Sequence, residues 1–385
     1  MDYQQITEII VEALGERVQN EIVRDDYQGW IERHLQDTLI KVITGFRRTG
    51  KSYLLKQLYR ELIEREKAPR ENIFFINFEH PLLIGINTGE KLRDLFDTFL
   101  MHAFPDMQIY LFLDEVQNVS GWEKFVRTLY DKAKDRFNIF ITGSNSTLLS
   151  SELSSALGGR VVELTVYPFS FKEVLKFKGI EANDPWGYAE NKQKIKLHLD
   201  RYIKYGGLPE SLDLNPESIR DYTEAIFRKV LLDDIVRRFK PERPELMEDL
   251  FYFLITNSGS ITSLRSLFKA MRASGKSLSL PTLTQYISYF ESAFAFSKIG
   301  KFSWKRRSVF NKLYKYYPVV SAFISFYSIN RRQFQSRLLE ATVYNHLTRF
   351  YKKIYYGRDT NADREIDFIV DLQNGEYLKV QATFE

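Results

Sequence analysis

The chain has 385 residues, which is more than one hydrophobic core usually serves, so we expect two or more domains. It contains no cysteine, which excludes disulfides, thiolate metal sites and cysteine nucleophiles. Hydrophobic residues make up 44% and charged residues 27%, proportions that are typical of folded proteins and exclude a disordered chain. The N-terminus lacks the basic-then-apolar pattern of a signal peptide, and no run approaches the roughly 18 apolar residues that span a membrane. A cytoplasmic protein is the simplest interpretation.

The net charge of +5 is unevenly distributed along the chain. Residues 261–320 contain eleven Lys and Arg against a single acid, Glu291, so this sixth of the chain alone carries a net charge of +10. The hypothesis of a nucleic-acid partner depends on this stretch.

A helix, a strand, a glycine loop and a second helix follow one another near the start of the chain. Apolar residues recur at helical spacing from Ile6 to Val18, and the mostly apolar segment 37–44 predicts a short strand that runs into Gly45. Residues 52–66 carry a leucine stripe and predict the next helix. Strand, glycine loop and helix in this order form the context that a phosphate loop requires.

The loop GFRRTGKS fits the GxxxxGK[ST] pattern of nucleotide phosphate loops. Its glycines let backbone N–H groups converge on phosphate oxygens, Lys51 reaches the terminal phosphates, and the Ser52 hydroxyl can ligate magnesium. The alternative is a plain glycine turn. The pattern predicts ATP with Mg²⁺, and we expect the nucleotide to contact Gly45, Phe46, Arg47, Arg48, Thr49, Gly50, Lys51, Ser52 and Tyr53. Of the two adjacent arginine side chains, we expect one to cover the phosphates and the other to face solvent or a lid.

A second motif supplies the metal holder and the water-orienting group that such a loop needs. The apolar run Tyr110–Leu113 predicts a buried strand that ends in Asp114 and Glu115. We expect Asp114 to hold magnesium, directly or through water, and Glu115 to polarise the attacking water. An acidic strand end at the surface is the alternative.

Polar residues also follow the next strand, where Ser144 and Asn145 are expected at the γ-phosphate. In this order the motifs resemble an AAA-type ATPase. The segments GFRRTGKSYLL, LFLDEVQNVSGWEKFVRTLYD, ITGSNSTLLSSELSSALGGRVVELTVYPFSFKEVL and YIKYGGLPE are similar to a large prokaryotic family of this type. The resemblance suggests that Arg160 neutralises γ-phosphate charge, in cis or from a neighbouring subunit of an oligomer. The alternative is an arginine that caps a glycine turn.

The family resemblance implies an α/β P-loop core with a helical lid, followed by a winged helix and a restriction-endonuclease-like end related to the PD-(D/E)XK enzymes. We therefore expect four domains: a core at 1–165, a lid at 166–245, a winged helix at 246–330 and a nuclease-like domain at 331–385. We expect the last domain to be incomplete, because the chain stops at Glu385 where the usual fold continues.

The expected winged helix has three helices and a basic hairpin. The helices are expected at 245–259, at 260–275 with Ser260 as candidate cap, and at 279–293, and two strands are expected around Gly300. The third helix offers no basic residue, so contact with DNA would be directed at phosphates. Winged helices also dock proteins, and this alternative stays open. The candidate DNA contacts are Lys301, Lys305, Arg306 and Arg307.

The end of the chain resembles a degenerate nuclease. Glu340 on a helix and Asp367 in a hairpin match metal ligands of the nuclease core, but the strand that carries Glu-x-Lys in active enzymes has Lys379 and Gln381 instead. We expect a non-catalytic module here.

The leading hypothesis is an ATPase whose cycle acts on DNA or on a partner protein through this C-terminal half. The alternatives are a nucleotide-gated binding switch with negligible turnover and an ATP-regulated nuclease.

Overall fold

The computed structural model describes residues 1–15, 21–146, 157–182, 184–276, 278–303, 313–328, 334–359 and 364–383. The chain divides into two compact units. The first unit consists of Met1–Gly45 and Thr49–Val166, and the second of Phe46–Arg48 and Tyr167–Glu385. Each unit has a hydrophobic core of its own.

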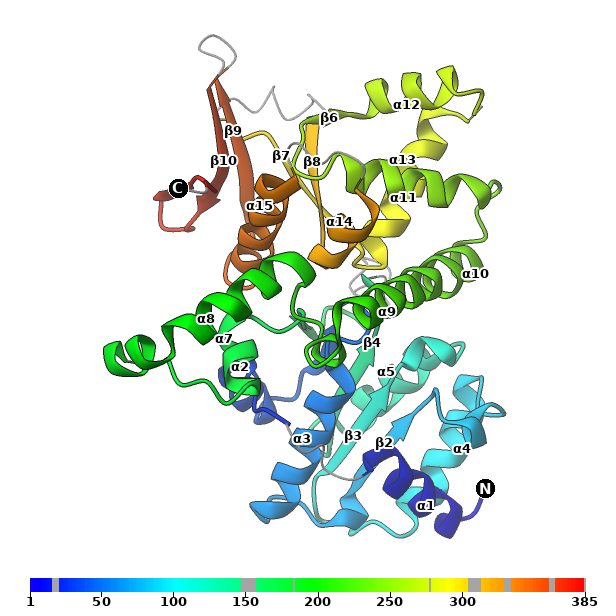
Figure 1. The fold of residues 1–385 in the computed structure, drawn as a ribbon. Helices are drawn as coiled ribbons and strands as arrows, with labels where there is room; N and C mark the ends of the chain where they lie inside the picture. Colours follow the sequence, from blue (N-terminus) through cyan, green and yellow to red (C-terminus); the bar gives the residue numbers. More distant parts are fainter. Residues whose placement is uncertain are drawn as a thin grey trace. The chain divides into compact units, whose positions relative to one another are not determined.

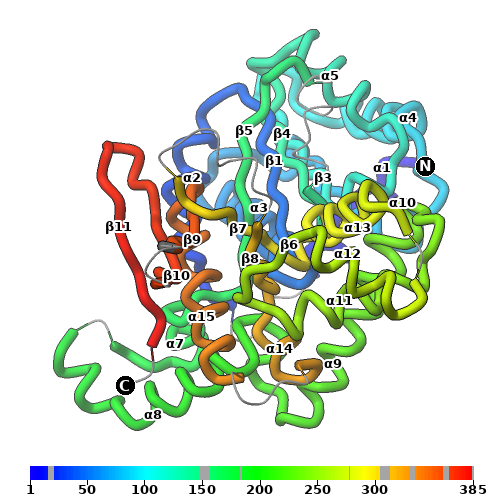
Figure 2. The backbone as a smooth tube through the Cα atoms, turned by 90° about the horizontal axis from the view of Figure 1, so that it is seen from above, coloured from blue at the N-terminus to red at the C-terminus, as the bar shows by residue number. Residues whose placement is uncertain are grey.

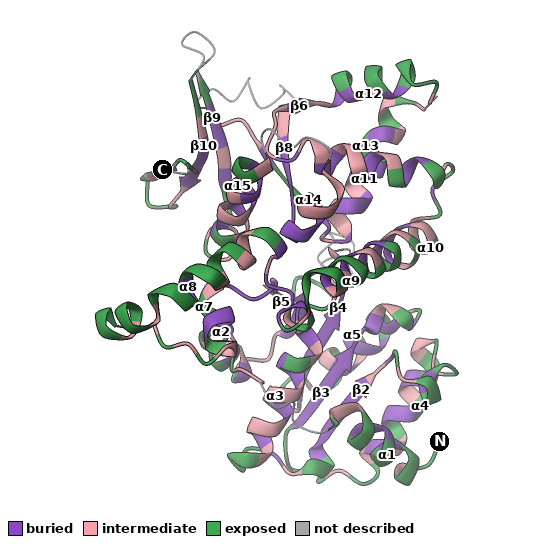
Figure 3. Ribbon diagram, viewed as in Figure 1, coloured by how far each residue is buried: buried purple, intermediate pink, exposed green. Residues whose placement is uncertain are grey.

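The first unit is built on a parallel sheet in the order β2-β3-β4-β1-β5, and Figure 2 labels β3, β4, β1 and β5 of this sheet. Four of these strands are almost wholly buried (Figure 3), because helices cover both faces of a parallel sheet and its strands are continuously apolar. This architecture is that of a P-loop NTPase core, as predicted. The strands are β1 (Ile40–Thr44), β2 (Ile73–Asn77), β3 (Ile109–Asp114), β4 (Phe137–Gly143) and β5 (Val161–Thr165).

Within the described residues of the first unit, five α-helices pack around this sheet. Figure 1 labels them α1 to α5. The chain moves across the sheet in one direction from β1 to β2 and in the other from β2 onward. Right-handed crossovers therefore place α3 on one face and α4 and α5 on the other. The predicted leucine stripe of α3 and the aromatic stripe of α5 are buried in the core. The helices are α1 (Tyr3–Leu14), α2 (Asp25–Leu35), α3 (Lys51–Glu64), α4 (Gly89–Leu100) and α5 (Trp122–Ala133).

The second unit begins with helices, as the sequence predicts for this region. Ser170 and Glu173 form a capping box at the start of α7, and Asn215 caps α9. A π-helical segment, η6 (Val230–Val236), follows α9 directly. The helices are α7 (Phe171–Phe177), α8 (Pro185–Tyr205), α9 (Pro216–Lys229) and α10 (Arg237–Phe239).

Three helices and a three-stranded antiparallel sheet follow. The sheet order is β6-β8-β7, so the last strand lies in the middle. Two details of the sequence prediction were wrong. The strand that pairs with β7 is Leu313–Pro318 rather than the segment directly after Gly300, and Ser263 rather than Ser260 caps the second helix. The elements are α11 (Glu245–Thr256), β6 (Thr262–Ser263), α12 (Leu264–Ala273), α13 (Leu280–Ser292), β7 (Phe296–Gly300) and β8 (Leu313–Pro318).

The chain ends with two helices and a second antiparallel sheet, in the order β11-β10-β9. The predicted helix, hairpin and following strand are all present here. The elements are α14 (Ser321–Tyr327), α15 (Phe334–Leu347), β9 (Ile354–Asp359), β10 (Arg364–Asp371) and β11 (Tyr377–Val380). The expected boundaries at 245/246 and 330/331 fall inside the second unit and stay predictions.

Candidate functional site

The carboxyl ends of three adjacent parallel strands bring the predicted site residues together. In the register of the sheet, Thr44 of β1 lies beside Gly143 of β4, and Leu113 of β3 lies beside Ile141 of β4. The residues that follow these strands therefore meet at one edge of the sheet, which is where α/β proteins place their ligands. They are Gly45 and its loop, Asp114 with Glu115, and Ser144 with Asn145.

Two positions of the phosphate loop require glycine. Gly45 has a φ of 145°, and a Cβ atom there would lie 2.1 Å from the carbonyl oxygen of Val166. Gly50 has a φ of 95° and forms the N-cap of α3. The first backbone N–H groups of α3 have no partner within the helix, so this turn provides the donors and the positive helix end that bind phosphate.

Lys51 and Thr49 are buried within this loop. The Nζ atom of Lys51 donates to the carbonyl oxygen of Gly45 at 3.1 Å. Arg24, which sequence reasoning missed, is buried and donates to the carbonyl oxygen of Thr49 at 2.8 Å. Arg24 lies just before α2, far from the loop in sequence, and no motif indicates its role.

Asp114 fits the role of a metal ligand. It is completely buried, its Oδ1 accepts a hydrogen bond from Thr142, and its Oδ2 has no hydrogen-bond partner among the residues that the structure describes. Burial, and then the charge of Glu115, raise the pKa of Asp114 to about 6, against the hydroxyls of Thr142 and Ser52 and the charge of Lys51. A cation beside Oδ2 would favour the ionised carboxylate, because an opposite charge at short range stabilises it.

Glu115 is held in an unusual backbone conformation. Its φ is 55°, a left-handed value that is uncommon for a residue other than glycine and typical of functional sites. Its backbone N–H donates to Oγ1 of Thr142 at 3.0 Å, so Thr142 orients both acids. The amide Nε2 of Gln117 donates to Oε2 of Glu115. Neither Thr142 nor Gln117 was among the predicted site residues.

The predicted polar residues after β4 are buried at the same edge of the sheet. Ser144 is 2% exposed, and its Oγ has no hydrogen-bond partner within the described part of the chain. Asn145 is completely buried. The segment 147–156 that follows lies outside the described residues.

The two loop arginines contact residues of the segment 166–245, where the lid is expected. Phe46–Arg48 belong to the second unit, and Phe46 is buried in its core. Arg47 makes a bidentate ion pair with buried Asp234, in which Nη2 lies 2.8 Å from Oδ1, and Arg48 pairs with exposed Glu210. Both side chains therefore bind carboxylates of the expected lid, and a contact of either one with phosphate stays a prediction.

The remaining loop residue, Tyr53, is 44% exposed on the first turn of α3. Its ring lies 5.4 Å from Nζ of Lys56.

Arg160 lies at the opposite edge of the sheet. Its carbonyl oxygen accepts from the N–H of Ile40, at the start of β1, while the phosphate loop follows the end of β1. A five-residue strand separates the two, which corresponds to about 16 Å. The guanidinium pairs with Asp131 of α5 and lies over the ring of Tyr130. The structure therefore does not bring Arg160 to the nucleotide site of its own chain.

The comparisons with known proteins agree with this core. Residues 37–175 match the AAA domain family, and residues 196–320 match a domain of unknown function, DUF8612. The chain is 31% identical to an uncharacterized protein, MJ1544, of Methanocaldococcus jannaschii, over 97% of this chain and 80% of that protein. It is 30% identical to an uncharacterized protein of Haemophilus influenzae, over 94% of this chain and 87% of that one. The chain belongs to the same family as these two proteins. Its AAA domain identifies this chain as an ATP-binding P-loop ATPase.

A solved structure has the same fold. The Walker-type ATPase paby2304 of Pyrococcus abyssi superimposes with a TM-score of 0.52 over 81% of this chain and 99% of that one, at 15% sequence identity. Within the described ranges, no helix is both long and apolar enough to cross a membrane.

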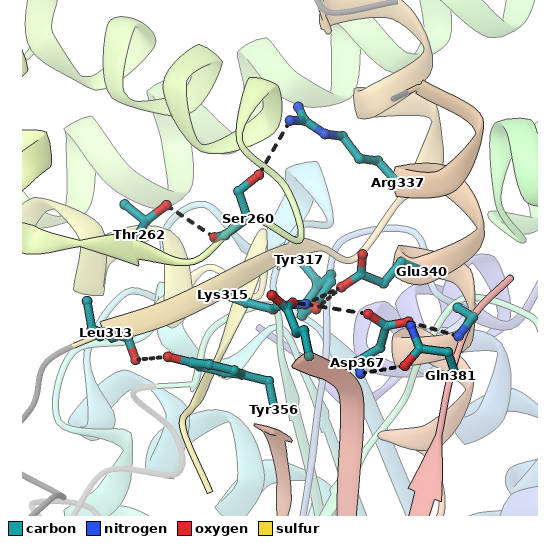
Figure 4. A network of polar contacts seen from close by, with 12 residues as sticks. Ser260, Thr262, Leu313, Lys315, Tyr317, Arg337, Glu340, Tyr356, Asp367 and Gln381 are labelled. Carbon is teal, nitrogen blue, oxygen red and sulfur yellow. Dashed lines mark hydrogen bonds and ion pairs between the residues drawn. The ribbon is translucent and has the colours of Figure 1, made fainter. Parts of the chain in front are cut away.

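Two of the predicted nuclease-like residues, Glu340 and Asp367, lie around a lysine that the prediction did not include (Figure 4). The Nζ atom of Lys315, on β8, lies 2.8 Å from Glu340, 2.5 Å from Glu365 and 3.8 Å from Asp367. The side chain of Lys315 is 1% exposed. Burial acts to lower its pKa, but Glu340 and Glu365 outweigh burial and raise the pKa, so the ammonium is retained.

The other contacts of this cluster also oppose a metal site. The Tyr317 hydroxyl donates to Glu340 at 2.7 Å, and Asp367 accepts from Nε2 of Gln381 at 2.7 Å and from the backbone N–H of Ala382 at 2.9 Å. Lys379 is exposed on β11. No group of three or more acidic or histidine side chains in the described ranges is arranged to hold a metal ion. The residues present therefore do not fit a nuclease metal.

The candidate DNA contacts lie mostly outside the described residues. Lys305, Arg306 and Arg307 are among residues 304–312, which the structure does not describe. Lys301 is half-buried and forms a backbone bridge to Tyr356.

Proposed function

We propose that this protein hydrolyses ATP with Mg²⁺ at the carboxyl edge of the first sheet and transmits the cycle to DNA through its second unit. The observation that carries the enzymatic part is the convergence of Lys51, Asp114 and Glu115 at one edge, with Asp114 Oδ2 buried and without a hydrogen-bond partner among the described residues.

Each residue has a chemical role in this proposal. The turn at Gly50 and Lys51 binds the β- and γ-phosphates, and Lys51 offsets their charge. Ser52 and Asp114 would hold Mg²⁺, which would neutralise charge that develops on the phosphates. Glu115 accepts a proton from the attacking water or orients that water. The hydroxyl of Thr142 keeps Glu115 in place by accepting a hydrogen bond from the backbone N–H of Glu115. Ser144 and Asn145 provide neutral hydrogen-bond donors at the γ-phosphate.

The test is phosphate release by the purified full-length chain. We expect Lys51→Ala to abolish ATP binding and turnover, whereas Glu115→Gln keeps ATP binding and loses turnover by about 10²–10⁴-fold, the usual contribution of a general base. Ser144→Ala should keep ATP binding and show a turnover between those of the wild type and Glu115→Gln. Wild-type protein that neither binds nor hydrolyses ATP would overturn the proposal.

A second candidate is a nucleotide-gated switch with negligible turnover. The hydrogen bond from Gln117 to the Glu115 carboxylate favours the switch, because the Gln117 amide occupies a position at Oε2 that the attacking water would otherwise take. A single-turnover measurement separates the two functions: a switch retains unhydrolysed ATP for many minutes, even with DNA present.

The order of elements supports DNA as the macromolecule on which the ATPase cycle acts. Three helices and a sheet in which β8 lies between β6 and β7 follow the winged-helix order α11-β6-α12-α13-β7-β8. The exposed side of α13 carries the neutral polar residues Thr284 and Gln285. A partner protein is the alternative load, and the ATPase rate with and without duplex DNA decides between them. An ATP-regulated nuclease is not supported, because Lys315 lies among the carboxylates that would bind its metal.

A further inference from the structure

We infer that the exposed face of α12 is a binding site for the phosphate backbone of duplex DNA. This inference rests on the proposed DNA load and names the residues that would bind it. They are Arg265, Lys269 and Arg272, a set that was not among the candidate contacts predicted from the sequence.

The three cations share one face of the helix. Their spacing of four and then three residues places them in a row, at about 6 Å and 10 Å along the axis from the first to the others. All three are exposed, as Figure 3 shows for much of α12. Each strand of a DNA duplex carries a phosphate about every 3.4 Å along its axis, so the row can follow two or three successive phosphates.

The three cations are not engaged in ion pairs within the described ranges of the chain. The sequence of α12 contains no Asp or Glu. Glu291, the one acid between residues 261 and 320, is largely buried and accepts a hydrogen bond from Lys298 at 2.7 Å. The neighbouring cation Lys276 pairs with Asp249. The charge of α12 is therefore available to an anionic partner.

The surface between the cations is hollowed. An open depression of about 540 Å³ is lined by the three cations together with Phe268, Ala273 and Leu280. Leu280 begins α13, so the depression reaches the helix that exposes Thr284 and Gln285. Charged groups on α12 beside neutral hydrogen-bonding groups on α13 match a duplex, in which charged phosphates flank the polar edges of the bases. A small anion would need convergent, buried donors, and these cations are exposed and arranged in a row.

The experiment measures binding of a fluorescein-labelled blunt duplex by the full-length chain over a range of salt concentrations. The test variant carries Arg265→Ala, Lys269→Ala and Arg272→Ala. The matched control carries Lys192→Ala, Lys194→Ala and Lys196→Ala, three exposed lysines of α8 in the same unit. We expect the test variant to lower the slope of log K against log salt by about 2 to 3, and the control to leave it unchanged. Two duplexes of unrelated sequence should bind equally.

Basal ATP hydrolysis is measured in parallel, because none of these six residues belongs to the nucleotide site. Unchanged hydrolysis in both variants shows that they are folded. If the wild type hydrolyses ATP but does not bind duplex, the inference is overturned and the ATPase stands. Equal slopes for the test variant and the wild type, or a loss confined to the α8 control, also overturn it. Inorganic pyrophosphate and phosphatidylserine vesicles are the competing probes: binding of either that depends on α12, without duplex binding, rejects DNA as the partner.

Discussion

Nζ of Lys315 lies 2.8 Å from Oε1 of Glu340, and this ion pair joins β8 to α15 within the second unit. Because the lysine is buried among three carboxylates, its removal leaves charge without compensation. We expect Lys315→Met to lower the free energy of unfolding by about 3 kcal/mol. Denaturant unfolding followed by circular dichroism measures this effect. The control Lys379→Met removes an exposed lysine of β11 and should change stability by less than about 0.5 kcal/mol. Equal stability of the two variants would contradict the role of Lys315.

The same cluster predicts that the protein is not a nuclease. A divalent ion and the Lys315 ammonium would compete for the same carboxylates, and Gln381 already binds Asp367. Supercoiled plasmid should therefore remain intact with Mg²⁺ or Mn²⁺, with or without ATP. Nicking by the wild type that disappears in Asp367→Asn would show that the cluster does bind a catalytic metal. Nicking that persists in this variant would come from another source.

The two loop arginines form ion pairs that differ in how far the acid is buried. Arg47 binds Asp234, whose side chain is 7% exposed, whereas Arg48 binds Glu210, whose side chain is 51% exposed. We expect Asp234→Asn to cost about 2–3 kcal/mol, because a buried guanidinium loses its charged partner. Glu210→Gln should cost less than about 1 kcal/mol, as is usual for exposed pairs. Denaturation midpoints of both variants test the contrast, and a larger effect of Glu210→Gln would reverse the assignment.

Gln117 is predicted to restrain catalysis. Its amide donates to the Glu115 carboxylate, and a hydrogen bond to a charged group contributes about 1.5–3 kcal/mol. Gln117→Ala should therefore raise kcat by about 10- to 100-fold and leave the KM for ATP unchanged, because the phosphate contacts are untouched. Steady-state phosphate release gives both constants. A fall in kcat of similar size would show instead that Gln117 orients Glu115 toward the water.

Arg160 should not contribute to ATP binding within one chain. It pairs with Asp131 at the edge of the sheet opposite the phosphate loop. Equilibrium binding of a fluorescent ATP analogue at low protein concentration should give the same Kd for wild type and Arg160→Ala, with Lys51→Ala as the positive control. If turnover falls in Arg160→Ala only at high protein concentration, the arginine acts on a neighbouring subunit. A weaker Kd at low concentration would contradict the position of this residue.

The sequence indicates the parts of the site whose chemistry lies within short segments. The phosphate loop, Asp114–Glu115 and Ser144–Asn145 each follow an apolar strand, and parallel pairing alone is enough to bring them to one edge. The helix α3 was predicted for a similar reason, because its leucine stripe lies within one short segment.

The remaining contacts join residues that no local pattern relates. Arg24 donates a hydrogen bond to the carbonyl oxygen of Thr49, and Lys315 forms an ion pair with Glu340. In both cases the two residues lie far apart in the sequence and meet only in the folded chain. Lys315 lies in the basic stretch 261–320, so its charge was counted toward DNA binding, although its side chain is buried. Asp234 lies in a π-helical segment, which single-sequence patterns do not reveal.

The assignment of Phe46–Arg48 to the second unit affects how the protein can be dissected. A fragment that ends at Val166 would contain the complete phosphate-loop motif. It would also expose Phe46, which is 1% exposed in the full chain, and separate Arg47 from Asp234. A stand-alone ATPase fragment of this chain should therefore be prone to aggregation and have a poorly ordered phosphate loop. Chimeras that exchange C-terminal halves between relatives will need to carry the acids at positions 210 and 234 together with the loop arginines.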